Sequence, residues 1–291
     1  MRKTVLSLVS VAALALAGCN GSPSSDQAGD GSPASPGSAA VAQVPSEVSG
    51  TISLRAGSPQ PSDKATLVLN LVDVSSTAAG SAPLATRTSP AGTFPQPFKL
   101  TFNPADVKPS DLYVVQANLT DGERHYVMPI QAPVLAKGSK NDSVSIQLQA
   151  EQTPGEKLLA EFKAEQEQLG AMKASHGTKL ETDASRGWQL FRQDGQIHFI
   201  RELVEYTKDG FTSTDYAYKN GKPWAIAQEH KPSRDGKPTS IDRAGWSDDG
   251  TLVLKQHQVG NDVTPLDADA ADKLKQEAMD ILGIATKGKN K

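Results

Sequence analysis

Apolar and polar residues alternate with a period of two over much of residues 45–150. Val144, Ile146 and Leu148 are separated by serine and glutamine, which is typical of a strand with one buried face. The same pattern predicts further short strands, about seven in all, at residues 51–55, 67–74, 84–88, 98–102, 112–119 and 125–130. Proline and glycine punctuate them and no helical period intervenes, so we expect an all-β sandwich of roughly 100 residues.

The pattern changes to that of a helix after residue 150. Thr153, Pro154 and Glu156 form a capping box with proline at the first helical position. Helical spacing then continues through Leu159, Phe162, Gln166, Leu169 and Met172, and Ser175-His176-Gly177 is expected to end a connecting helix over residues 151–177. We expect such a helix to pack on its own domain or to serve as a spacer. The alternative is that it binds a partner through its apolar face.

Strand-like runs return in residues 178–291. Asx-Gly pairs at 194–195, 209–210, 220–221, 235–236 and 249–250 separate runs at 188–191, 197–206, 211–218, 224–230, 240–246 and 252–259. Because such pairs between strands are strong hairpin signals, we expect an antiparallel meander of about six strands.

A second helix is predicted near the end of the chain. Thr264-Pro265-Leu266-Asp267 caps it, and Ala270, Leu274, Ala278, Ile281 and Leu282 share one side. One sheet face needs a cover, so we expect this helix to pack on the meander, with a basic tail at residues 287–291.

A short apolar run at the start of the chain ends in Leu16-Ala17-Gly18-Cys19. Arg2 and Lys3 precede the run, which is too short to span a bilayer. We interpret residues 1–18 as a lipoprotein signal peptide that is cleaved between Gly18 and Cys19. Cys19 would then carry a diacylglycerol thioether and an acylated amino group, for example with palmitate. The alternative is an ordinary cleaved signal with a chance cysteine.

Residues 19–44 are rich in glycine, serine, proline and alanine and contain no aromatic residue. This composition predicts a disordered tether that holds the folded part away from the membrane. Asn20 follows the cysteine in place of the aspartate that retains lipoproteins in the inner membrane of enteric bacteria. We therefore expect a periplasm-facing lipoprotein of the outer membrane, held to it through the N-terminal lipid.

Composition and charge exclude several classes of function. The chain has 30 basic and 33 acidic residues, which is no nucleic-acid signature. Its one cysteine is the expected lipid carrier, which leaves no disulfide and no cysteine metal site. No phosphate loop or nucleophile elbow occurs, and we expect no cofactor, no metal and no catalytic residue.

Two sets of side chains in the second domain are candidates for function. If the three tryptophans Trp188, Trp224 and Trp246 share an open sheet face, they form an aromatic binding platform. The alternative, which we expect, is that they belong to the core beneath the C-terminal helix. His198, His230 and His257 lie on different predicted strands and could meet Glu202, Glu205 or Glu229, but their spacing matches no metal motif.

Three stretches carry a resemblance to a known family. They are residues 48–51 (VSGT), residues 67–75 and above all residues 98–107 (FKLTFNPADV), which are similar to the YbaY/YscW-type lipoproteins. The resemblance implies a compact β-sandwich on a lipid anchor, and some members are pilotins that escort outer-membrane secretin subunits. Residues 218–224 (YKNGKPW) more weakly resemble the hairpin unit of MORN-like repeats.

These observations favour a non-enzymatic, lipid-anchored envelope protein. It would bind or support another envelope or secretion-system component, with pilotin-like escort as the specific form of the hypothesis. The alternative from a different class is an envelope hydrolase with a histidine and carboxylate site in the second domain. A third is a purely structural protein of the envelope stress response. The sequence specifies no oligomeric state.

Overall fold

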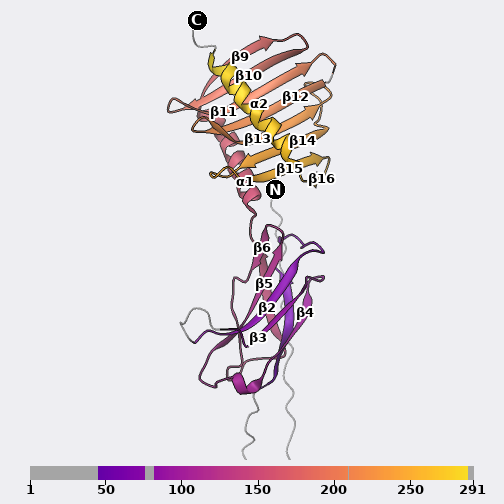
Figure 1. The fold of residues 1–291 in the computed structure, drawn as a ribbon, viewed down its shortest axis with the longest axis vertical. Helices are drawn as coiled ribbons and strands as arrows, with labels where there is room; N and C mark the ends of the chain where they lie inside the picture. Colours follow the sequence, from indigo (N-terminus) through magenta and orange to yellow (C-terminus); the bar gives the residue numbers. More distant parts are fainter. Residues whose placement is uncertain (1–44, 76–81, 209, 288–291) are drawn as a thin grey trace, which may run out of the picture. The chain divides into compact units, whose positions relative to one another are not determined.

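Two β-sheets and two long helices make up the described part of the chain (Figure 1). The computed structural model describes residues 45–75, 82–208 and 210–287, which belong to a unit spanning Val44–Lys291. Strands account for 50% and helices for 17%, so the expected mostly-β class with an internal and a C-terminal helix is confirmed. The expected signal peptide, the tether and the tail beyond Lys287 lie outside the described residues.

The first sheet is built from eight strands. They are β1 (Glu47–Leu54), β2 (Thr66–Asp73), β3 (Ala85–Pro90), β4 (Gln96–Thr101), β5 (Tyr113–Asp121), β6 (Arg124–Val127), β7 (Ala132–Val134) and β8 (Val144–Ala150). Their order is β3-β2-β5-β6-β8-β1-β4, with β7 beside β5. Pairing is antiparallel except between β1 and β8. The edge strands β3 and β4 approach each other, since Arg87 Nη1 donates to the Lys99 carbonyl at 3.2 Å.

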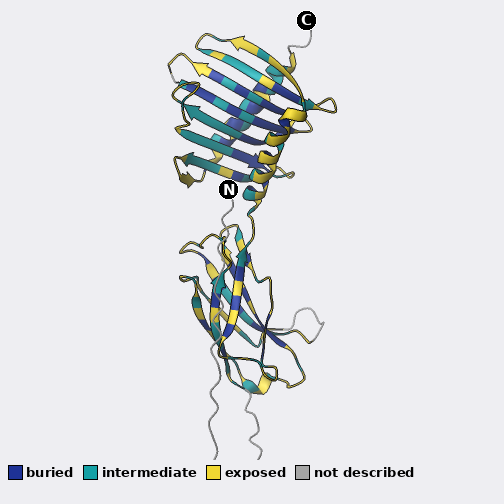
Figure 2. Ribbon diagram, turned by 180° about the vertical axis from the view of Figure 1, so that it is seen from behind, coloured by how far each residue is buried: buried dark blue, intermediate teal, exposed yellow. Residues whose placement is uncertain are grey.

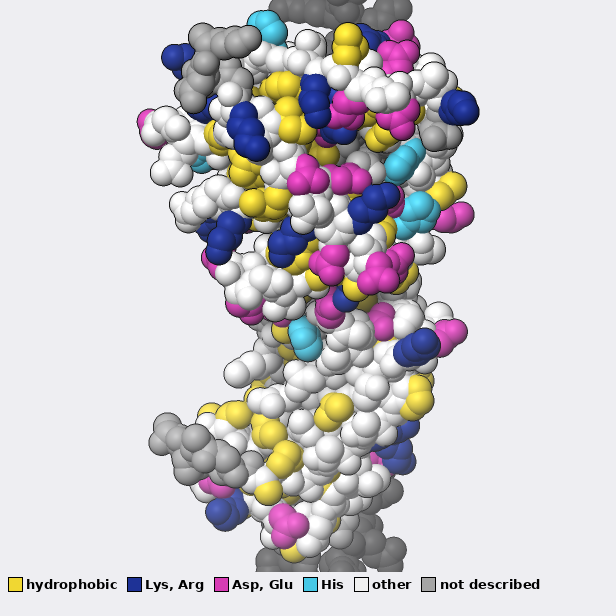
Figure 3. Space-filling model, turned by 45° about the horizontal axis from the view of Figure 1, so that its top comes forward, with side chains coloured by type: hydrophobic (Ala, Val, Ile, Leu, Met, Phe, Trp, Pro, Cys, Tyr) yellow, Lys and Arg dark blue, Asp and Glu magenta, His cyan; other side chains and the backbone are white. Residues whose placement is uncertain are grey.

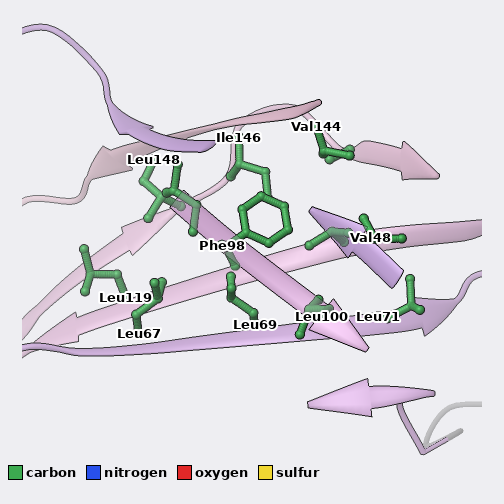
Figure 4. Close-up of a cluster of buried hydrophobic side chains, with 14 of the residues drawn as sticks. Val48, Leu67, Leu69, Leu71, Phe98, Leu100, Leu119, Val144, Ile146 and Leu148 are labelled. Atoms are coloured by element: carbon green, nitrogen blue, oxygen red, sulfur yellow. The ribbon is translucent and has the colours of Figure 1, made fainter. Parts of the chain in front are cut away.

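The core of this sandwich follows from the alternation in the sequence. Val144, Ile146 and Leu148 of β8 are all buried, as the period of two predicts. Figure 4 shows side chains of β1, β4 and β8 gathered with those of β2 and β5 in one apolar cluster. Gly50 has no room for a side chain, because a Cβ there would lie 1.9 Å from the Val144 carbonyl oxygen of the paired strand.

The sandwich differs from the predicted seven strands by one. The extra strand, β7, has three residues, of which Ala132 and Val134 are buried. A segment this short shows too little alternation to be recognised in the sequence. Asn103-Pro104-Ala105-Asp106, the stretch that carries the family resemblance, forms a 3₁₀ turn in which Asn103 Oδ1 accepts from the Ala105 N–H at 3.1 Å. Its role in the fold is therefore a cap.

The first helix, α1 (Pro154–Gln168), begins at the predicted capping box. The Thr153 hydroxyl accepts from the Glu156 N–H at 3.2 Å, and the Glu156 carboxylate accepts from the Thr153 N–H at 3.0 Å. The predicted end at residue 177 is wrong. After a 3₁₀ turn, η2 (Leu169–Ala171), the chain continues as strand β9 (Lys173–Leu180). Almost every residue of β9 is exposed, so no apolar alternation marked it.

The second sheet is an antiparallel meander in strict chain order, β9 to β16. After β9 its strands are β10 (Ala184–Gln193), β11 (Gln196–Tyr206), β12 (Gly210–Lys219), β13 (Lys222–Lys231), β14 (Ser240–Trp246), β15 (Leu252–Val259) and β16 (Asp262–Thr264). The six predicted strands are present, and the exposed edge strands β9 and β16 extend them to eight. Asp194-Gly195 and Asn220-Gly221 make tight hairpins with positive φ at both positions, as predicted.

Each face of the meander carries one helix. The second helix, α2 (Ala268–Lys287), packs on one face of the meander, as expected. It buries Leu274, Ala278 and Ile281 as predicted, but Ala271 is buried in place of Ala270, which is partly buried together with Leu282. Helix α1 buries Leu158, Phe162 and Leu169 against the opposite face. The expectation that α1 packs on its own domain is therefore confirmed. Seen from behind, α1 runs along one side of the sheet and leaves the neighbouring strands in view (Figure 2).

Candidate functional site

The predicted lipidation site cannot be placed in the structure. Gly18 and Cys19 lie outside the described residues, so cleavage and acylation at this position stay predictions. Among the residues that the structure describes, neither α1 nor α2 is long and apolar enough to cross a bilayer.

The three tryptophans do not share one face of the meander. Trp188 and Trp246 belong to the apolar cluster beneath α2. Trp224 lies on the α1 side, where its ring meets Phe162 edge-on with 6.2 Å between ring centroids. Each ring therefore has a part in packing one of the two helices.

Two of these tryptophans nevertheless meet at one surface hollow. Trp224 and Trp246 line a shallow depression of about 610 Å³ at the end of the β12–β13 hairpin. Lys275 of α2 covers the Trp246 ring, with Nζ 4.7 Å from the ring centroid. A cation over an aromatic face occupies the position that a stacked ligand would take. Binding at the tryptophans thus stays a prediction, and the geometry favours Trp224 as the more accessible ring.

The histidines are divided between the two faces. His198 lies on the α1 side, where its Nδ1 is 3.3 Å from Glu165 Oε1 of the helix. Burial raises the pKa of the Glu165 carboxyl, against the opposing effect of the His198 hydrogen bond. Sequence reasoning named His198 but not this helix partner, because nothing in the local sequence shows which part of α1 crosses β11.

His230 and His257 converge on a carboxylate that the sequence did not single out. Asp242 Oδ2 is 3.3 Å from His230 Nε2, and Asp242 Oδ1 is 2.5 Å from His257 Nδ1. Both imidazoles are about two-fifths exposed, at 41% and 40%. The cluster is therefore open to solvent. The carboxylate can hydrogen-bond to each ring and so fix its orientation.

Register explains why Asp242 is the residue that meets His257. Hairpin pairing aligns one residue from each of five strands across the α2 face, in the order Glu202, Thr214, Gln228, Asp242 and His257. Neighbours in such a row have side chains within contact distance. Cross-strand register joins positions far apart in sequence, so this polar row was not visible in the chain.

Glu202 anchors the buried end of this row. Its side chain is 2% exposed and is paired with the Arg186 guanidinium, and its Oε2 accepts from the Tyr216 hydroxyl at 2.9 Å. Burial raises the Glu202 pKa, against the opposing effect of Arg186. Burial also raises the pKa of Tyr216, well above its usual range. With its oxygens held by these two partners, Glu202 is a structural charge and not a proton donor to a substrate.

Other predicted carboxylates have partners of their own. Glu229 lies on the α1 face and contacts Lys231, with Oε2 and Nζ 2.8 Å apart. Glu205 is exposed and lies 3.8 Å from Arg234 Nη2. Within the described ranges, no three histidine, cysteine, aspartate or glutamate side chains are arranged to hold a metal ion. The hydrolase alternative therefore rests on two histidine–carboxylate contacts, His198–Glu165 on the α1 side and His230–Asp242–His257 on the α2 side.

The surface gives no simple charge signal. Figure 3 shows acidic and basic side chains interspersed over the face that it displays. On the sandwich, large apolar side chains are exposed at Leu112 (59%) and Ile130 (78%). Leu112 has a half-exposed apolar neighbour, since its carbonyl accepts from the Val74 N–H at 2.8 Å and Val74 is 38% exposed. Paired exposed apolar side chains are candidates for contact with a partner.

Comparisons with known proteins identify a relationship for the sandwich. No curated protein matches the chain. A pilotin of the type II secretion system of Vibrio cholerae, described as an alternative pilotin, is similar at 20% identity and a TM-score of 0.33. The match covers 36% of this chain and 96% of that one. A family model matches residues 43–148. The resemblance predicted from residues 48–107 is thus confirmed: residues 43–148 are similar to the type III secretion system lipoprotein chaperones of the YscW family.

Proposed function

We propose that this protein is a lipid-anchored envelope protein that binds and escorts a component of a secretion system. The observation that carries the proposal is the match of residues 43–148 to a family described as a lipoprotein chaperone of type III secretion. The lipobox that ends at Cys19 supports the anchor, because several acyl chains on one residue hold a protein stably at a membrane. The sandwich is then the binding module, and its role is non-enzymatic.

The apolar pair Leu112 and Val74 is the proposed contact on this module. The two residues lie where β2 ends and β5 begins, with the Val74 N–H bonded to the Leu112 carbonyl. Leu112 is 59% exposed, so it can be buried by a partner without a change in the fold. Burial of these two side chains at an interface is favourable, because it removes apolar surface from water.

Deletion of the gene in a strain with an active secretion system tests the function. The amount of secretin subunit in the outer membrane is measured after complementation with the wild type, Cys19→Ser or Leu112→Asp. We expect the wild type to restore the amount of secretin subunit in the outer membrane. Cys19→Ser should leave the secretin subunit mislocalised, and Leu112→Asp should restore only a small part of it. Val263→Asp is a matched control, because Val263 is 54% exposed on the edge of the other sheet. Unchanged secretin assembly in the deletion strain would refute the proposal.

A further inference from the structure

The α1 face of the meander contains a cleft that the proposed function does not use. It has a volume of about 440 Å³ and lies between α1 and strands β11 to β14. Leu159, Phe162 and Ile241 supply apolar walls, and Lys163, Arg201 and Arg243 bring positive charge. The strands beside α1 are uncovered in Figure 2. The volume is within the range of about 300–1,000 Å³ that is usual for ligand sites.

Both carboxylates that line the cleft are already engaged. Asp215 accepts two hydrogen bonds from Arg201, each of 2.8 Å, at Nε and Nη2. It accepts a third from Gln166 Nε2 of α1, at 2.7 Å. Glu229 is paired with Lys231 at 2.8 Å. The negative charge in the cleft is thus largely neutralised by residues of the same chain.

The guanidinium of Arg243 has no carboxylate partner among the described residues. Its Nη1 donates to Gln258 Oε1 at 2.8 Å, and no carboxylate of the described residues lies within 4.0 Å of its guanidinium. Burial lowers the pKa of this group, against the opposing effect of Glu229. The partly buried arginines Arg124, Arg186 and Arg201 are each paired with a carboxylate, and their pKa values are raised. Arg243 is therefore partly buried without a carboxylate in direct contact, whereas each of the other three arginines has one.

We propose that this cleft binds an acidic peptide segment in which a carboxylate side chain lies beside an apolar one. The carboxylate pairs with the guanidinium of Arg243, and the flat fork of arginine favours two parallel hydrogen bonds to it. Lys163 adds a second positive charge from α1, and the apolar neighbour packs on Leu159 and Ile241. Charge complementarity thus selects the occupant.

A peptide fits the cleft walls better than a simple acyl carboxylate. The Ser213 hydroxyl lines the cleft, and Gln166 has an amide oxygen that is not used in its bond to Asp215. These groups can pair with the amides of a peptide main chain, which an acyl chain lacks. The site belongs to the second sheet, so it is independent of the contact proposed for the sandwich.

Titration of the full chain with two blocked tripeptides tests this site. The probes are Leu-Glu-Leu and its uncharged analogue Leu-Gln-Leu, and binding is followed by amide chemical shifts in NMR spectra. We expect the acidic peptide to bind at least tenfold more tightly, and Arg243→Gln to abolish that preference. Arg55→Gln, which removes an exposed arginine of the sandwich, is the matched control and should leave the preference unchanged.

The other outcomes overturn the proposal. Equal affinity for the two peptides would show that the carboxylate is not recognised. An unchanged preference in Arg243→Gln would place the site elsewhere, and binding of decanoate without binding of either peptide would assign the cleft to an acyl ligand. If Arg243→Gln fails to fold, Lys163→Gln on the exposed side of α1 replaces it and should weaken the acidic peptide alone.

Discussion

Truncation of Phe162 tests whether α1 is an integral part of the second domain. The Phe162 side chain is 2% exposed. Its ring centroid lies 5.7 Å from that of Phe199 on β11 and 6.2 Å from that of Trp224 on β13. In Phe162→Ala the ring is removed while the helix propensity is preserved or improved. Any loss of stability therefore reports on the contact between helix and sheet.

The structure gives the size of the expected effect. A buried Phe→Ala change leaves a cavity and costs about 3–5 kcal/mol. For a domain of this size that corresponds to a fall of roughly 6–20 °C in the melting temperature. Because Trp224 contacts the deleted ring, its fluorescence should also change in the native state. Denaturant unfolding followed by circular dichroism and by tryptophan fluorescence measures both effects.

A control on the same helix makes the result decisive. Glu167 of α1 is exposed, so Glu167→Ala should alter stability by less than about 0.5 kcal/mol. If Phe162→Ala is as stable as this control, α1 does not pack on the meander in solution. The helix would then be a spacer or a free partner-binding segment, and the cleft beside it would have no fixed wall.

Three further predictions concern the rest of the fold. Gly50→Ala should destabilise the sandwich by at least about 1–3 kcal/mol in urea unfolding, because the new Cβ meets the Val144 carbonyl. Normal stability would refute the parallel β1–β8 pairing. Tyr218→Phe should cost about 1 kcal/mol through loss of the buried 2.7 Å bond from its hydroxyl to the Ala278 carbonyl of α2, and a neutral effect would argue against docking of α2 at this point. The hydrogen bond from Arg124 lowers the pKa of the Glu156 carboxyl, so this pair stabilises the fold above the carboxyl's unfolded pKa, and the stabilisation is lost as the pH falls through the lower folded pKa. Glu156→Gln should therefore reduce the loss of stability at acid pH in a plot of unfolding free energy against pH. The same loss in the wild type and the variant would contradict this prediction.

Local patterns predicted the elements that have one buried and one solvated face. Val144, Ile146 and Leu148 defined β8, and the capping box at Thr153 defined the start of α1. The strands that were missed lack such a contrast. Residues of β9 and β16 are exposed on nearly every position, and β7 has only three residues. Their strand conformation comes from pairing with a neighbour and not from their own pattern.

The candidate sites were harder to predict than the elements. His257 was recognised as a candidate, but Asp242 was not, since their contact depends on the register of β14 and β15. Arg243 carried no signal at all in the sequence. Its isolation is visible only when the partners of Arg124, Arg186 and Arg201 are compared. Side-chain convergence across strands depends on exact register, and a shift of one residue, such as the irregularity between Gly245 and Trp246, changes which side chains share a face.

Site-specific crosslinking in cells tests the central claim most directly. A photoreactive residue is placed at position 112 of the sandwich or, as the control, at position 263 of the second sheet, in the lipidated full-length protein. The account predicts that the probe at 112 captures a subunit of the secretion channel and that the probe at 263 does not. Failure of the probe at 112 to capture any recurrent partner, with normal membrane localisation of the protein, would contradict the escort function.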